Sequence, residues 1–444
     1  MRIGSSYRDI VRLVWPLALG MVNNAVMQFV DRAYLARESL EALEAVMPAG
    51  ILAWVFMGFF QSLVGYANVL IGQYHGAGDA AKCRATYRVA TLVALAAGML
   101  SVPLLFVGDA VLRLTANSPQ LYVGESIYFT ITILGAVSVY SQMAAAAYFT
   151  GMGRTRLVFG VNLLGNVLNI VLDPVFIFGW CGMPRLGIAG AAFVTVGSMF
   201  VQWGVLAFAA RRTGDRAATD MRELRDILLR LLRFGLPSAM YEVLNMLSFS
   251  IFVFVTEGVG ELELAVSNTC FTINYLLFAP MMGFSLGAQT LVAQAIGRGD
   301  PDAAAADARR TLILGVGFVA VFSALAIVFA HPILDLFASK AGADTATFHA
   351  LGFTLLLLMA AWQVFDSADV IICGALKGGG DTRFVMGWML FAAFIVWMPL
   401  VFAVRHFHNT MPALWGTMIL FVLVGGIGST IRWCGGRWRS IRVV

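Results

Sequence analysis

The chain has 444 residues, of which 60% are hydrophobic and only 12% are charged. With a mean hydropathy of +0.82, this composition excludes an ordinary soluble protein. The formal net charge of +5 comes from basic loops between apolar segments, so we expect no nucleic-acid partner.

Twelve apolar segments are each long enough to cross about 30 Å of hydrocarbon as a helix. They are continuous rather than alternating, which favours helices over a β-barrel. We therefore expect an all-α polytopic membrane protein. The expected spans are 10–35, 46–72, 86–108, 124–150, 157–179, 187–210, 227–256, 264–295, 309–331, 349–376, 384–404 and 412–433.

The distribution of the 30 Lys and Arg residues predicts the orientation of these spans. Most of them lie before the first span, in the loops that follow even-numbered spans, and after the last span. The positive-inside rule then places both termini in the cytoplasm. The first span is too long for the apolar region of a signal peptide, so we expect it to stay in the membrane.

The sequence also repeats itself. "GRTR" at 153–156 resembles "GDTR" at 380–383, and five residues recur with an offset of 221. We expect an N-lobe (1–210), a cytoplasmic linker (211–226) and a C-lobe (227–444). Six spans per lobe make the copies parallel, related by a pseudo-two-fold axis along the membrane normal. The recurring residues are Gln73, Gly76, Gly78, Asp79 and Arg88, which reappear as Gln294, Gly297, Gly299, Asp300 and Arg309.

The first span carries polar residues on one face. Asn24, Met27, Gln28 and Asp31 follow one another at helical spacing, and Asp31 is late in a span that runs outward. An ionised carboxylate at membrane depth costs at least a few kcal/mol unless a cation, a partner or a proton relieves it. Arg32 is adjacent, but we expect it to reach toward the outer surface.

The fifth span has the narrowest polar stripe. Asn162, Asn166, Asn169 and Asp173 are spaced so that they fall within about 60° of one another on a helix. Amide oxygens and a carboxylate in one line suit a hard cation or a proton. Hydrogen bonding between helices is the alternative explanation of the Asn residues. Since Asp173 is as late in its span as Asp31, the two carboxylates could meet.

The second half has its own intramembrane acids. Glu242 shares a face of the seventh span with Asn245, and Asp366 lies in the tenth span with Asp369 one turn further on. Because Glu242 and Asp366 fall at similar depth, we predict that they form a pair. Phe249 and Tyr275 lie on candidate cavity faces, where packing is the alternative role.

These residues and several motifs give the chain a resemblance to the MATE (multidrug and toxic compound extrusion) family, with features of both its DinF-like and NorM-like branches. The motifs are "WPLALG" and "FVDRAYLAR" in the first span, "GQYHGAGD" after the second and "NVLNIVLDPVFIFG" in the fifth. "GIAGAAFVT", "FGLPSAMYE" and "DSADVIICGALKGGGDTR" follow in order. The resemblance covers essentially the whole chain.

The resemblance implies a function and a set of site residues. It implies an antiporter of a bacterial cytoplasmic membrane that exports amphipathic organic cations in exchange for H⁺ or Na⁺, with no cofactor. The N-lobe coupling site of the DinF-like branch falls on Asp31, Asn169, Asp173 and Thr195; Asp31, Asn169 and Asp173 would hold the metal ion if coupling uses Na⁺. The proline that bends the first span falls on Pro16, a candidate hinge.

The NorM-like branch implies a second coupling site. Its C-lobe carboxylates fall on Glu242 and Asp366, so the chain matches both branches. The candidate substrate cavity adds Asn24, Met27, Gln28, Asn166, Asn245, Phe249 and Tyr275. We expect a monomer in the lipid bilayer.

Three other functions are open to such a chain. A lipid-linked oligosaccharide flippase would need cationic residues in its cavity to bind a pyrophosphate, and inside the spans only Arg32, near the outer rim, qualifies. The hypothesis of a membrane-embedded enzyme is not supported, because the sequence contains no H-E-x-x-H or G-x-S-x-G motif. A passive channel would not concentrate its substrate.

Overall fold

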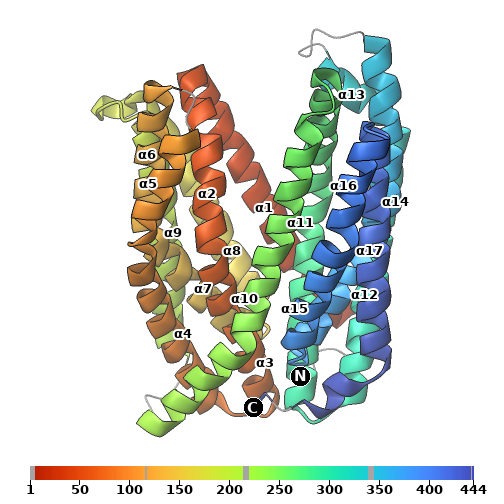
Figure 1. Ribbon diagram of the computed structural model, residues 1–444. Coiled ribbons are helices and arrows are strands. Elements are labelled where there is room, and N and C mark those ends of the chain that lie inside the picture. The colour runs from red at the N-terminus through yellow and green to blue at the C-terminus, as the bar shows by residue number, and fades with distance from the viewer. Residues whose placement is uncertain (1–5, 116–117, 214–219, 339–344, 442) are drawn as a thin grey trace. The chain divides into compact units, whose positions relative to one another are not determined.

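The computed structural model describes residues 6–115, 118–213, 220–338, 345–441 and 443–444. Within these ranges the chain is almost entirely helical and contains no strand (Figure 1). In chain order the helices are α1 (Tyr7–Glu38), α2 (Leu40–Gly65), α3 (Ala67–Gly76), α4 (Ala80–Ser101), α5 (Leu104–Thr115), α6 (Pro119–Leu134), α7 (Ala136–Gly151), α8 (Thr155–Phe178) and α9 (Ile188–Arg211). They continue as α10 (Met221–Glu257), α11 (Glu261–Gly297), α12 (Pro301–Val328), α13 (Ala330–Ala338), α14 (Thr345–Gly378), α15 (Thr382–Leu390), α16 (Met398–Phe407) and α17 (Met411–Cys434).

In the described ranges, ten helical stretches are long and apolar enough to cross a membrane. If each of two bent helix pairs is counted as one further span, the number reaches the expected twelve. Helices α4 and α5 meet at 45°, and α6 and α7 meet at 42°. Pro103 lies at the first bend, where it removes a backbone donor. Gly135 lies at the second bend, where a Cβ atom would stand 2.2 Å from Val196.

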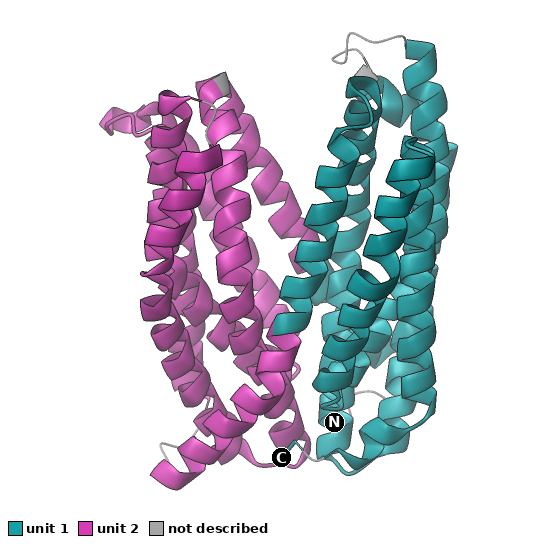
Figure 2. Cartoon of the chain, viewed as in Figure 1, with its two compact units in different colours: residues 1–18, 240–443 teal, residues 19–239, 444 magenta. Residues whose placement is uncertain are grey.

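The chain divides into two compact units, which Figure 2 colours separately. Unit 1 contains residues 1–18 and 240–443, and unit 2 contains residues 19–239 and Val444. The borders therefore fall inside α1 and α10, whereas the sequence suggested lobes of 1–210 and 227–444 around a linker. The first turns of α1 belong to unit 1 because Ile10, Leu13, Val14 and Leu17 join a core cluster with residues of α11 and α14.

The repeat in the sequence is also present in the backbone of two loops, the one between α3 and α4 and the one between α11 and α12. Gly78 and Gly299 both have a positive φ, +80° and +73°, a conformation that glycine adopts without steric cost. The next residue in each copy begins the following helix: Asp79 accepts the N–H of Lys82, and Asp300 accepts the N–H of Ala303, both at 2.9 Å. The same turn and the same N-cap thus recur 221 positions apart.

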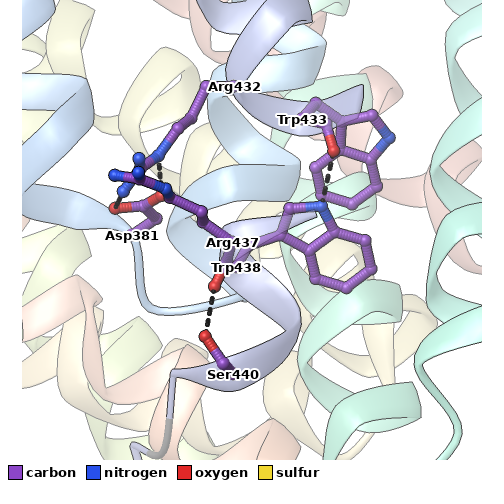
Figure 3. A network of polar contacts seen from close by, with 6 residues as sticks. All are labelled: Asp381, Arg432, Trp433, Arg437, Trp438 and Ser440. Atoms are coloured by element: carbon purple, nitrogen blue, oxygen red, sulfur yellow. Dashed lines mark hydrogen bonds and ion pairs between the residues drawn. The ribbon is translucent and has the colours of Figure 1, made fainter. Parts of the chain in front are cut away.

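A short helical turn, η3 (Arg437–Ser440), follows α17 and packs onto unit 1 near the end of the chain. Trp438 in this turn is buried and stacks on Trp433, with ring centroids 4.2 Å apart. Figure 3 shows its indole N–H donating to the carbonyl of Trp433 at 2.8 Å. The same view shows Arg432 donating to both oxygens of Asp381, at 2.6 and 3.2 Å. This bidentate pair ties the end of α17 to the start of α15.

The Arg432–Asp381 pair gives a first prediction. The Asp381 side chain is only 5% exposed, so Arg432→Gln should leave a buried carboxylate without its cation. We expect the free energy of unfolding to fall by about 3 kcal/mol, measured by thermal or denaturant unfolding in detergent. Arg439 pairs with Asp302 at 2.8 Å, but both side chains are well exposed, so the control Arg439→Gln should cost at most about 1 kcal/mol. Equal losses in the two variants would contradict the prediction.

Candidate functional site

The buried face of α8 carries the polar stripe that the sequence singled out. Asn166, Asn169 and Asp173 are each at most 1% exposed. Asp31 of α1 is half-buried, and its carboxyl group lies close enough to that of Asp173 to act on it electrostatically. Both residues belong to unit 2, which therefore brings together the two acids that the sequence placed at a common depth.

Side chains from α1 and α9 complete this group. The amide of Asn166 donates to Oδ1 of Asn24 at 2.8 Å, and the amide of Asn169 donates to Oγ1 of Thr195 at 3.3 Å. The Thr195 hydroxyl is itself directed to the carbonyl of Ala191 at 2.9 Å. Three helices thus hold the amide groups of the stripe in fixed orientations.

The fixed amides leave oxygen atoms unused. Oδ1 of Asn166, Oδ1 of Asn169 and both carboxylate oxygens of Asp173 are buried, and none has a hydrogen-bond donor among the described residues. An ionised carboxylate only accepts hydrogen bonds, so a bond between Asp31 and Asp173 requires a proton on one of them. Buried, unsatisfied acceptors around two acids form a site that a proton or a hard, oxygen-seeking cation would satisfy.

The first residue of the stripe has a different role. The side-chain oxygen of Asn162 accepts a hydrogen bond from Gln142 of α7 at 3.1 Å. Asn162 therefore takes part in helix–helix packing, the alternative that the sequence left open for it. Arg32 is exposed, and its charge is close enough to act electrostatically on Asp31.

Tyr128 of α6 is a residue of this site that the sequence analysis missed. It lies within electrostatic range of Asp31, Asp173 and Arg32 and packs against the core cluster around Leu35. Its hydroxyl is a potential donor to a carboxylate. Its sequence neighbours at helical spacing, Glu125 and Thr132, were not among the candidate residues. That polar face of the span is the signal that could have identified Tyr128.

Glu242 of the C-lobe has a partner that the sequence did not predict, and its pairing with Asp366 stays a prediction. Glu242 of α10 forms an ion pair with Lys377 at 2.7 Å, whereas the sequence paired it with Asp366. The Lys377 side chain is 9% exposed, and its ammonium group lies 4.0 Å from the centre of the Tyr241 ring. Lys377 thus places a cation inside a lobe where the sequence analysis recognised none.

The remaining acids of α14 lie around the same tyrosine. Asp366 and Asp369 are both within electrostatic range of Tyr241. Asp369 accepts hydrogen bonds from Ser429 of α17 at 2.7 Å and from the thiol of Cys373 at 3.4 Å. A cavity of about 10 Å³, room for roughly one water molecule, is lined by residues that include Tyr241, Asp369, Cys373, Trp388 and Ser429.

The other candidate cavity residues are distributed over both units. Asn24, Met27, Gln28 and Asn166 belong to unit 2, and Asn245, Phe249 and Tyr275 belong to unit 1. Met27 is buried and Gln28 is exposed. Phe249 packs edge-on against Phe271. Their participation in one substrate cavity stays a prediction.

Pro16 lies inside α1, two residues before that helix passes from unit 1 to unit 2. A proline in a helix interior removes one backbone hydrogen bond and favours a bend. This position agrees with a hinge, and the hinge itself stays a prediction.

Comparison with known proteins places the chain in a family. The MatE family model matches residues 16–175 and 237–403. A probable multidrug resistance protein NorM of Rhizobium meliloti (strain 1021) is 25% identical over 398 residues, 88% of this chain and 84% of the relative. Multidrug resistance protein PmpM of Pseudomonas aeruginosa is 26% identical over 408 residues, 90% and 84% of the two chains.

A solved structure has the same fold. An outward-facing multidrug resistance MATE family transporter of the MOP superfamily matches with a TM-score of 0.85 at 21% identity, covering 98% of this chain and 96% of that one. The predicted all-α polytopic fold is thereby confirmed, and the relatives named above are multidrug resistance proteins rather than enzymes. Because the family model matches most of the chain, in both of its halves, the protein belongs to the MATE family of membrane transporters.

Proposed function

We propose that the protein is a multidrug efflux antiporter that exports amphipathic organic cations in exchange for H⁺ or Na⁺. Its family and the names of its relatives support export of drugs. The observation that carries the proposal is the Asp31–Asp173 group, with its unsatisfied buried oxygens in α8. Two carboxylates attract a cation, and they can neutralise the positive charge of either the substrate or the coupling ion, but not of both at once.

The exchange follows from competition for these two acids. Without a coupling ion, an ionised Asp173 in an apolar lobe needs a positive partner, and a cationic substrate supplies one. A proton on one carboxyl, or a Na⁺ ion among the oxygens of Asp31, Asn169 and Asp173, removes that need. The substrate then leaves outward, and the coupling ion remains bound for the return.

Alternating access would come from rocking of the two six-helix lobes against each other, as in other transporters built from repeats. Pro16 would act as the hinge of the first span. We further propose a monomer in the cytoplasmic membrane of a bacterium, with both termini in the cytoplasm, since the basic residues favour that side.

A lipid-linked oligosaccharide flippase is the second candidate, and Lys377 is the residue that could support it. A pyrophosphate needs free Arg or Lys groups, but the charge of Lys377 is already paired with Glu242. The acids of the two lobes therefore favour a cationic substrate over an anionic one.

Transport in proteoliposomes tests the proposal. We expect an imposed pH or Na⁺ gradient to drive accumulation of a fluorescent organic cation against its concentration gradient, and the effective ion identifies the coupling ion. A passive channel would only equilibrate the dye. Preference for a lipid pyrophosphate over the organic cation would instead support the flippase.

A further inference from the structure

Two histidines and an aspartate meet at the end of unit 1 where α12 passes into α13, far from the N-terminal turns of α1 (Figure 1). His331 lies at the start of α13, and His349 lies in the first turns of α14. None of the three residues belongs to the candidate coupling sites. The proposed transport function therefore leaves this cluster without a role.

The two imidazole rings face each other through one nitrogen each. Nδ1 of His331 lies 3.4 Å from Nδ1 of His349. The ring centroids are 5.5 Å apart and the planes differ by only 16°, so the two Nδ1 atoms lie on the facing edges of nearly parallel rings. Two imidazoles on one tetrahedral Zn²⁺, with Zn–N bonds of 2.0–2.1 Å, also have their nitrogens about 3.4 Å apart.

Asp335 fixes which nitrogen of His349 is available. Nε2 of His349 lies 2.9 Å from Oδ1 of Asp335, and an N–H there donates to the carboxylate. A neutral histidine carries one N–H, so Nδ1 of His349 keeps its lone pair, directed at His331. A carboxylate behind a histidine is the usual arrangement around a metal-binding imidazole, where it orients the ring and raises its basicity.

The surroundings hold the two rings in place. His331 lies against the ring of Phe353, with centroids 6.2 Å apart and planes 11° from parallel. Helices α13 and α14 are in close contact, since a Cβ atom on Gly352 would stand 2.8 Å from Leu334. The His349 side chain is 14% exposed and that of Asp335 is 65% exposed. The cluster is therefore buried at His349 and open to solvent at Asp335.

We propose that His331 and His349 form a binding site for a divalent transition-metal ion such as Zn²⁺ or Cu²⁺, with Asp335 as the orienting carboxylate. The metal lies beside the line that joins the two Nδ1 atoms, about 2 Å from each, and replaces the proton of the hydrogen bond between them. His331 then carries its proton on Nε2, and water molecules complete the coordination. Imidazole nitrogen is a preferred ligand of both ions, and Cu²⁺ binds such sites most tightly among the divalent first-row metals. The bound ion links α13 to α14.

The test uses the full-length protein in detergent, purified through a tag without histidine. We expect one equivalent of Cu²⁺ to bind, with electron paramagnetic resonance showing two nitrogen ligands, and Zn²⁺ to compete for the same site. His331→Ala and His349→Ala should each lower the affinity at least about tenfold and remove one nitrogen ligand. His406→Ala changes another exposed histidine of unit 1 and should leave binding unchanged.

Asp335→Asn separates metal binding from a structural role. It keeps both ligands and the fold, and we expect affinity to fall about tenfold because the orienting charge is lost. Unfolding temperatures measured without metal identify any variant that is simply unstable. Wild-type Cu²⁺ binding in the double variant His331→Ala/His349→Ala, or its loss in His406→Ala, would overturn the proposal.

Discussion

Asp173→Asn should reduce ion-driven efflux of an organic cation by at least about tenfold, toward the rate of empty liposomes. Asparagine keeps the size of the side chain and its capacity to accept hydrogen bonds. It removes the charge that attracts either the substrate or the coupling ion at a position that is 0% exposed. A tenfold loss corresponds to only about 1.4 kcal/mol, less than the cost of an unrelieved charge at membrane depth.

Asp31→Asn should have a similar effect in the same assay, because the two carboxyl groups act on one bound charge. Asp109→Asn is the matched control in unit 2. Asp109 is a half-buried acid outside the candidate site that pairs with Arg113 at 2.9 Å, and its substitution should leave efflux unchanged. The protein must be quantified in each set of liposomes. Wild-type efflux in both Asp31→Asn and Asp173→Asn would rule out the N-lobe as the seat of coupling.

Lys377→Met should have the largest effect in the C-lobe. Methionine keeps much of the length of the side chain but removes the cation that pairs with Glu242. Breaking a buried ion pair from one side costs about 3–5 kcal/mol, and the partial exposure of Glu242, 35% for its side chain, places the loss near the lower end. We expect the free energy of unfolding in detergent to fall by about 3 kcal/mol.

The double variant Lys377→Met/Glu242→Gln distinguishes charge from packing. Because it removes both charges, most of the lost stability should return. In Lys377→Met alone, Glu242 lacks its internal cation, so added Na⁺ should stabilise the variant more than the wild type. Equal instability of the single and double variants would show that Lys377 acts through packing and not through its charge.

The N-lobe site could be largely predicted from local patterns. Asn166, Asn169 and Asp173 fall on one face because an α-helix turns 100° per residue, and that spacing is readable in the sequence. The common depth of Asp31 and Asp173 follows from their positions in two spans with the same direction. The sequence could not predict that Tyr128 of α6 lies within electrostatic range of these acids, because the rotation of α6 against α1 and α8 is a property of the packed lobe.

The sequence analysis missed Lys377 as a partner of Glu242 for a geometric reason. Lys377 lies at the end of α14, one residue beyond the expected span, and was counted with the loop charges. Side chains in a helix point back toward its N-terminus, so a lysine near the end of α14 reaches into the lobe. There it meets Glu242, 135 residues away in sequence.

The sequence by itself determined the twelve expected spans, the internal repeat and the acids within the spans, and its resemblance to a known family implied the transport function. Hydrophobic length, loop charge and helical periodicity are local properties, and each can be read without knowing the fold. The tertiary structure decided which side chains meet: Asn169 with Thr195, Glu242 with Lys377, and His331 with His349. It also brings Asp31 within electrostatic range of Asp173. These contacts depend on how helices far apart in the chain pack and rotate against one another, and a repeat or a periodicity does not encode those rotations.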